Sequence, residues 1–208
     1  MHSKASYFFN HWKTILGFAL IGAVLGLVGS FLRPLEYSST LSLLIVPKNI
    51  STADPYTALR SIDRIADNLS QIVYTSTFFD KVFSKSAGPD RAQFGSDEIK
   101  KRKKWHRSVA VSINRGTGLF KITAYHLQPI QARLLAESVA DVLIAEGWQY
   151  VGADFEIKLV DAPLESRYPV RPNIPFVVLG SMLAGISAGL IYVFWHYHTH
   201  KQRIFGIG

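Results

Sequence analysis

The run TILGFALIGAVLGLVGSFL at residues 14–32 decides the architecture, because it holds nineteen residues without a charge between Lys13 and Arg33. A helix of this length rises about 28 Å, close to the thickness of a bilayer core. A signal peptide is the alternative, but its apolar core is about 7–15 residues long and ends at a small-x-small cleavage site. Val28-Gly29-Ser30 is a poor cleavage site. We therefore predict a retained transmembrane helix.

A second uncharged run, IPFVVLGSMLAGISAGLIYVFW, occupies residues 174–195 and predicts a second transmembrane helix. The tails at 1–13 and 196–208 carry Lys and Arg but no Asp or Glu. The positive-inside rule, which counts such short flanks, places both termini in the cytoplasm. Residues 33–173 then lie outside as one extracytoplasmic domain, which contains all fifteen acidic residues.

Composition narrows the function classes. The 208 residues are 48% hydrophobic and carry 23 Lys and Arg against 15 Asp and Glu, a formal charge of +8. A positive balance favours an anionic partner. The chain contains no cysteine, which excludes disulfides, thiolate zinc sites, iron–sulfur clusters and Cys nucleophiles.

Hydrophobic periodicity in the outer segment predicts an α+β fold in the order β-α-β-β-α-β with an extra short helix. This order suggests a ferredoxin-like split sheet, in which the first and last strands are antiparallel neighbours. The predicted strands are 37–46, 109–113, 120–124 and 155–159, and the predicted helices start at Asp54-Pro55, cover 77–83, start at Ser96-Asp97-Glu98 and start at Pro129.

Small residues repeat every four positions in both apolar runs, which predicts close helix packing. The same stretch contains the G-x-S-x-G pattern of serine hydrolases at 185–189, but that pattern has meaning only on a strand–turn–helix elbow. Helix packing is the preferred interpretation. The residues expected to pack are Gly22, Gly26 and Ser30 in the first run and Gly180, Ser181, Gly185 and Gly189 in the second.

A basic cluster at residues 100–107 is the strongest candidate binding site. Some of its charge complements the dipole at the end of a helix, but six fixed positive charges exceed that need. Because the cluster is expected outside the cell, an anionic glycan or anionic lipid headgroups are more suitable partners than nucleic acid. The predicted contacts are Lys100, Lys101, Arg102, Lys103, Lys104 and Arg107.

No cofactor or metal site is predicted. His196, His198 and His200 resemble a metal tract, but only His196 and His200 share a helical face, and a third ligand with suitable spacing is missing. The phosphate-binding loops G-x-x-x-x-G-K-[ST] and G-x-G-x-x-G do not occur. No catalytic group of carboxylates or Ser/His/Asp can be assembled, so we expect a protein that is not an enzyme.

Prolines dominate the approach to the second apolar run, in the sequence DAPLESRYPVRPNIP at residues 161–175. Successive prolines oppose helix formation and hold the chain extended. This segment, with the Gly-rich run after it, resembles the same region in the Wzz-type polysaccharide co-polymerases, the chain-length determinants of surface polysaccharides. The His-Trp-Lys lead-in at 11–13, the Asp-Pro-Tyr helix start at 54–56 and the Pro-Ile-Gln-Ala helix start at 129–132 extend the resemblance over nearly the whole chain.

The resemblance implies an inner-membrane homo-oligomer that regulates the chain length of an exported polysaccharide: lipopolysaccharide O-antigen, capsule or exopolysaccharide. Implied partners are membrane lipid, a polysaccharide polymerase or its glycan product, and, as in the compact capsular adaptors, a cytoplasmic tyrosine kinase. Pro169, Pro172 and Pro175 would then set the junction between domain and membrane. The alternative is a two-span sensor, which requires an apolar pocket with convergent polar groups for a small ligand.

Overall fold

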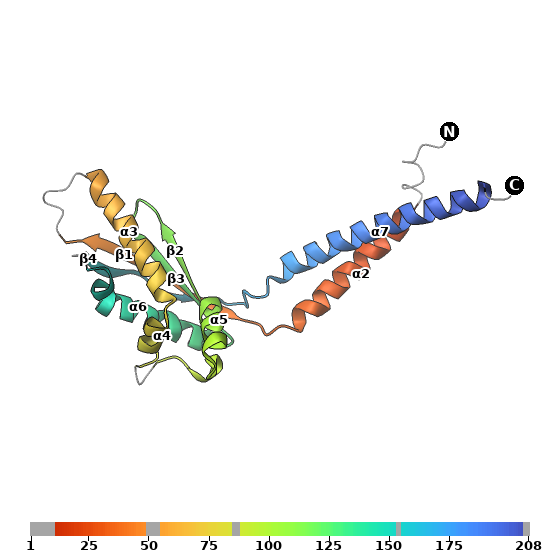
Figure 1. The fold of residues 1–208 in the computed structure, drawn as a ribbon. Helices are drawn as coiled ribbons and strands as arrows, with labels where there is room; N and C mark the ends of the chain where they lie inside the picture. Colours follow the sequence, from red (N-terminus) through yellow and green to blue (C-terminus); the bar gives the residue numbers. More distant parts are fainter. Residues whose placement is uncertain (1–10, 49–54, 85–87, 153–154, 206–208) are drawn as a thin grey trace. The chain divides into compact units, whose positions relative to one another are not determined.

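The computed structural model describes residues 11–48, 55–84, 88–152 and 155–205 (Figure 1). The chain divides into two compact units. One consists of residues up to Leu35 together with those from Arg171 onward, and the other comprises Glu36–Val170.

The first unit is a pair of helices, α2 (Trp12–Phe31) and α7 (Ile174–Phe205). Both are long and apolar enough to cross a membrane, which confirms the two predicted apolar helices. Helix α2 begins two residues before the predicted run, and α7 continues beyond residue 195 to Phe205. The segment predicted as a C-terminal tail is therefore mostly a helical extension, because nothing in its sequence stops the helix.

The second unit contains a four-stranded antiparallel sheet in the order β2-β3-β1-β4. Its strands are β1 (Tyr37–Pro47), β2 (Val109–Asn114), β3 (Leu119–His126) and β4 (Phe155–Glu165). The predicted antiparallel pairing of the first and last strands is confirmed, with Ile45 opposite Ile157. The hairpin β2–β3 is also confirmed, and its turn contains Gly116 and Gly118 at positive φ, where other residues would be strained.

The helical segments that accompany the sheet in the described residues are α3 (Pro55–Val73), α4 (Ser76–Val82), the 3-10 turn η1 (Ala92–Phe94), α5 (Glu98–Ser108) and α6 (Pro129–Val151). Helices α3 and α6 place their apolar residues on one face of the sheet (Figure 1). Alternation in β1 buries Leu41, Leu43 and Ile45 against them, as the sequence predicts. Pro129 occupies the first turn of α6, where its missing N–H is not needed.

The last strand is longer than predicted. Strand β4 runs to Glu165 instead of ending near residue 159, so the proline-rich segment begins as part of the sheet. Pro163 is tolerated there because β4 is an edge strand. Beyond the strand, Ser166 N donates to Ser38 O (2.8 Å), and Val170 N donates to Glu36 O (2.8 Å). The two ends of the domain are therefore bonded side by side.

Candidate functional site

The basic cluster forms one complete helix, α5, which the sequence specifies through its ends. Asp97 caps the N-terminus, where its side chain accepts a hydrogen bond from Lys100 N (2.9 Å). Glu98 adds a negative charge in the first turn and Arg107 a positive charge in the last, both favourable to the helix dipole. The predicted helix start at residues 96–98 is confirmed.

An aromatic cluster anchors α5 to the domain. Trp105 is 1% exposed, and its indole Nε1 donates to the carbonyl of Val73 (2.7 Å), in the last turn of α3. Its ring meets Phe79 edge-on with the centroids 5.1 Å apart, and Phe94 lies 6.0 Å away. Sequence reasoning did not identify this anchor. The available signal was the single Trp in a helix whose only other apolar residue is Ile99.

A second contact holds the neighbouring side of α5. The His106 ring stacks on Tyr74 with the centroids 4.3 Å apart, and the Tyr74 hydroxyl accepts a hydrogen bond from Val111 N (3.2 Å). Helix α5 is thus tied to α3 and to strand β2, and it presents its remaining faces from a fixed position.

The structure removes Lys101 from the predicted contact surface. Lys101 is 7% exposed, its ammonium donates to Glu98 Oε1, and it lies 5.2 Å from the centre of the Phe79 ring. A buried ammonium needs such a partner, because desolvation otherwise disfavours the charge. Lys101 therefore stabilises α5 instead of meeting a ligand. Lys104, although exposed, donates to the Gln93 carbonyl (2.6 Å).

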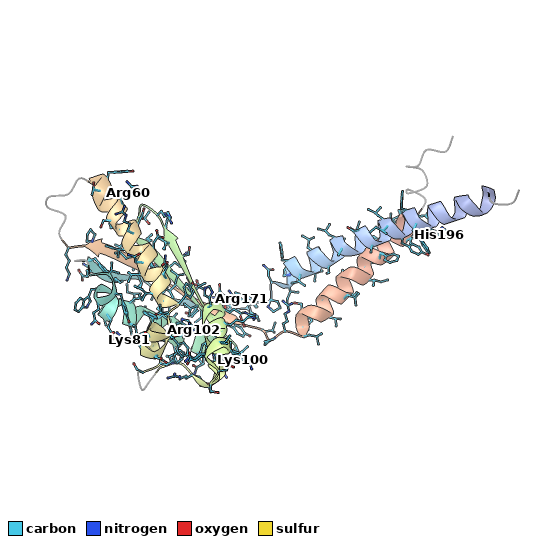
Figure 2. All side chains as sticks on the ribbon, in the orientation of Figure 1. Arg60, Lys81, Lys100, Arg102, Arg171 and His196 are labelled. Carbon is cyan, nitrogen blue, oxygen red and sulfur yellow. The ribbon has the colours of Figure 1, made fainter. Side chains whose placement is uncertain are left out.

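The other cations remain on the solvent side of α5, as the labelled Lys100 and Arg102 illustrate in Figure 2. At 100° per residue, one stripe of the helix about 100° wide collects four positive side chains. Of the residues in α5, Lys100, Arg102 and Lys103 make no ion pair with any described residue. The stripe consists of Lys100, Lys103, Lys104 and Arg107.

Two hollows flank α5. A narrow crevice between α5 and Tyr74 has no room for a water-sized group. An open groove of about 500 Å³ lies between α5 and η1 and is lined by Arg91, Ser96 and Glu98, among others. Charged residues of both signs line this groove, unlike the apolar pocket with convergent polar groups that a small-ligand sensor requires.

The small residues of the two apolar helices pack against each other within one chain. A Cβ added at Gly22 would lie 2.5 Å from the Ser181 carbonyl oxygen. One added at Gly26 would overlap the Ser181 side chain, and one added at Gly185 would overlap the Phe18 carbonyl. A Cβ added at Gly189 would lie 3.1 Å from the Phe18 Cβ and 3.2 Å from the Ile15 Cα. These glycines let the backbones of α2 and α7 approach closely.

Of the other predicted packing residues, Gly180 is outside the contact between the helices and Ser30 is buried. Gly180 lies outside the contact, since nothing stands within 4 Å of an added Cβ, because its position on α7 faces away from α2. Ser30 is 2% exposed at the end of α2, and its hydroxyl has no hydrogen-bond partner among the described residues. The small-residue repeat therefore identifies the packing face but not each member of it.

The prolines of the junction have different local roles. Pro169 precedes the Val170–Glu36 hydrogen bond that closes the domain. Pro172 lies outside the helix, whereas Pro175 lies in the first turn of α7. Asn173 accepts hydrogen bonds from Val177 N (3.0 Å, to its carbonyl) and Phe176 N (3.4 Å, to its side chain). Pro175 thus belongs to the helix start, where proline is favoured, and not to the extended segment.

The remaining sequence motifs lie on continuous helix. Ser187 of the G-x-S-x-G pattern donates to the Leu183 carbonyl one turn earlier (3.0 Å), so it is not on a nucleophile elbow. His196 lies near Tyr192, with the ring centroids 6.1 Å apart. The side chains of His198 and His200 lie outside the described residues. No group of three His, Asp or Glu within the described part of the chain is placed to hold a metal ion.

Charge on the opposite side of the domain forms a second cluster. Arg133 on α6 bonds Glu137 (2.9 Å) and lies 3.7 Å from Glu165 on β4. The hydrogen bond to Glu137 raises the pKa of the Arg133 guanidinium, so this cation is fixed between two carboxylates.

Comparison of the sequence with known proteins gives no match: no family model matches the chain, and no curated protein matches it.

Proposed function

We propose that this chain is a membrane-anchored polysaccharide co-polymerase that oligomerises and regulates the chain length of an exported surface polysaccharide. The observation that carries the proposal is an α+β domain whose two ends continue into two apolar helices that pack on each other. In this function the chain organises a polymerase and its growing product without chemistry of its own.

The domain belongs, in this proposal, to the ferredoxin-like class. Support comes from the strand order β2-β3-β1-β4, in which β1 is antiparallel to both of its neighbours. The chain lies in the inner membrane with both termini in the cytoplasm. Lys13 at the start of α2 and the Lys and Arg beyond residue 195 favour that orientation.

The polymerase or its glycan product meets the outer domain, and membrane lipid surrounds the helices. A cytoplasmic tyrosine kinase is the alternative partner, reached through the tails. Helix α5 supports an electrostatic contact with an acidic partner, because Lys100, Arg102 and Lys103 are exposed on a helix that the buried Trp105 anchors.

The test is deletion of the gene, followed by gel separation of the surface polysaccharide by size. We expect the deletion strain to lose its modal chain length and the wild-type gene to restore it. An unchanged length distribution with unchanged polymer amount contradicts the proposal. In that case a ligand-induced thermal shift of the full chain in detergent would favour the two-span sensor.

A further inference from the structure

Charge is separated across the outer domain. Helix α5 carries six Lys and Arg against Glu98 alone. Helix α6 and strand β4 together carry six carboxylates against two cations of their own, and one of these carboxylates, Glu146, is paired with Lys81 of α4. The carboxylates are Glu137, Asp141, Glu146, Glu156, Asp161 and Glu165, and the cations are Arg133 and Lys158.

Helix α5 and strand β4 lie at opposite edges of one sheet, and α6 packs on the face of the sheet over β4, β1 and β3. Helix α5 leads directly into β2, which is one edge strand, and β4 is the other (Figure 1). The register aligns their charges. Glu165 is in the same row across the sheet as Val109, the residue after α5, and Asp161 is in the row of Ser112. The acidic side of one domain is thus level with the basic side of another domain placed beside it.

Both edges expose groups that the domain itself does not use. Lys100 and Lys103 on α5, and Asp161 on β4, form no ion pair with any described residue. Each edge also exposes apolar side chains, with Ile99 on α5 81% exposed and Leu164 on β4 78% exposed. Such a combination of opposite charge and exposed apolar groups is characteristic of complementary surfaces.

We propose that these two edges bind each other in successive copies of the chain. The β4–α6 edge of one copy docks on the α5–β2 edge of the next, head to tail. This inference deepens the proposed function, since it rests on the membrane-anchored oligomer and names the surfaces that join its subunits.

A second copy fits these edges better than a polyanion. An acidic glycan or an anionic lipid surface would use α5 alone and would leave the exposed Asp161 and Leu164 of the β4 edge without a partner. A symmetric contact of α5 with α5 would bring like charges together. Head-to-tail contact is the arrangement that satisfies both edges, and it produces a ring when the rotation between copies closes.

Side chains, and not a continued backbone ladder, make this contact. Strand β4 has register shifts opposite Thr40–Ser42 and Ser42–Leu43, and it contains Pro163. Such irregularities prevent an edge from pairing with another strand. The expected interface is therefore electrostatic and apolar, and it weakens as salt is raised.

Cross-linking tests the arrangement directly, because the chain has no cysteine of its own. Ser112→Cys is placed on β2 and Val160→Cys on β4, and membranes containing the full chain are treated with a bismaleimide. A chain with both substitutions should give a ladder of dimers, trimers and larger products. Mixed single variants should give dimers only, and each single variant alone should give monomers.

Charge reversal tests the contacts. In a chain that also carries both cysteines, Lys100→Glu with Lys103→Glu should reduce cross-linking by about tenfold. Asp161→Lys with Glu165→Lys should do the same, and the chain with all four reversals should recover the ladder. Lys121→Glu, an exposed charge on the open face of the central strand β3, is the matched control and should change nothing. Circular dichroism and thermal melting in detergent show which variants remain folded.

Several results would overturn the inference. A ladder from either single cysteine, or an intact ladder after reversal on folded chains, excludes this interface. Reversal on α5 that abolishes binding to anionic vesicles or an acidic glycan while the ladder persists assigns α5 to a polyanion instead. Failure of the proposed function is distinguishable, because polysaccharide length can remain unchanged in the deletion strain while the ladder is still observed.

Discussion

Trp105 joins helix α5 to the rest of the α+β domain through a single hydrogen bond and a set of ring contacts. Its partner, the Val73 carbonyl, lies in the last turn of α3, where carbonyls have no partner within the helix. The indole thus satisfies a buried acceptor and fills the space between α4, η1 and α5. Trp105 is therefore the buried anchor of the basic stripe, beside the stacking of His106 on Tyr74.

We expect Trp105→Ala to lower the free energy of unfolding by about 3–5 kcal/mol, because it leaves a large cavity and an unpaired carbonyl. Trp105→Phe keeps most of the ring volume, loses the donor and should cost about 1–2 kcal/mol. Guanidinium unfolding of the full chain in detergent, followed by circular dichroism, measures both. Equal losses for Ala and Phe would contradict the packing argument.

His126 is a buried histidine at the end of β3. It is 8% exposed, and its Nδ1 accepts a hydrogen bond from Gln128 N (3.0 Å), the N-cap residue of α6. Burial lowers the pKa of the imidazole, an effect only partly offset by the negative charges of Asp90 and Glu36. The folded domain therefore favours the neutral imidazole, in which Nδ1 carries no proton and accepts the hydrogen bond from Gln128 N.

The direction in which stability changes with pH follows from the linkage between proton binding and folding. Because the pKa of folded His126 is below its unfolded value of about 6.5, stability should be constant above that pH and fall as pH is lowered beneath it. Melting temperatures of the full chain in detergent between pH 7.5 and 5 measure this. His126→Gln should show a smaller decrease than wild type. An identical pH dependence in both chains would assign the effect to other groups.

At the scale of elements, the contact between α2 and α7 depends on where each glycine faces. Gly185 has the backbone of Phe18 and Ala19 against it, whereas Gly180 has open space. We expect Gly185→Leu to separate the helices and lower the thermal stability of the chain in detergent, by about 1–3 kcal/mol. Gly180→Leu is the matched control on the same helix. Similar losses in the two variants would show that helix contact is not responsible.

The secondary structure was largely predictable because its signals are local. Alternation in 37–46, the proline at 129 and the cap at Asp97 each specify one element. The extension of β4 to Glu165 was missed because its residues are mostly exposed and its pairing with β1 includes register shifts. A strand segment that is exposed on both faces, as β4 is after Ile157, has no alternation of buried and exposed residues to predict it.

The candidate site was predictable in position and not in detail. The charged residues at 100–107 located α5, but the sequence alone does not show that Lys101 turns inward beside Glu98 and Phe79. Likewise, four-residue spacing identified the packing faces of α2 and α7, yet Gly180 faces away. Both outcomes depend on tertiary neighbours that are distant in sequence.

For the whole molecule, the decisive prediction is its orientation across the membrane. Because the chain lacks cysteine, a single Ser112→Cys or Thr199→Cys can report on one side without background. In spheroplasts, a membrane-impermeant maleimide should label the first variant directly and the second only after permeabilisation. Labelling in the reverse order would invert the topology and place the outer domain in the cytoplasm.

The hydrogen bonds between Ser166 and Ser38 and between Val170 and Glu36 have a mechanical consequence. Force transmitted along the two helices would reach the domain at neighbouring atoms and pull the start of β1 away from the end of β4. A force that pulls two antiparallel strands apart at one end acts on one hydrogen bond at a time, so the bonds break in sequence from that end. The domain should therefore yield first at these ends, while α5 and the hairpin at its far edge keep their shape.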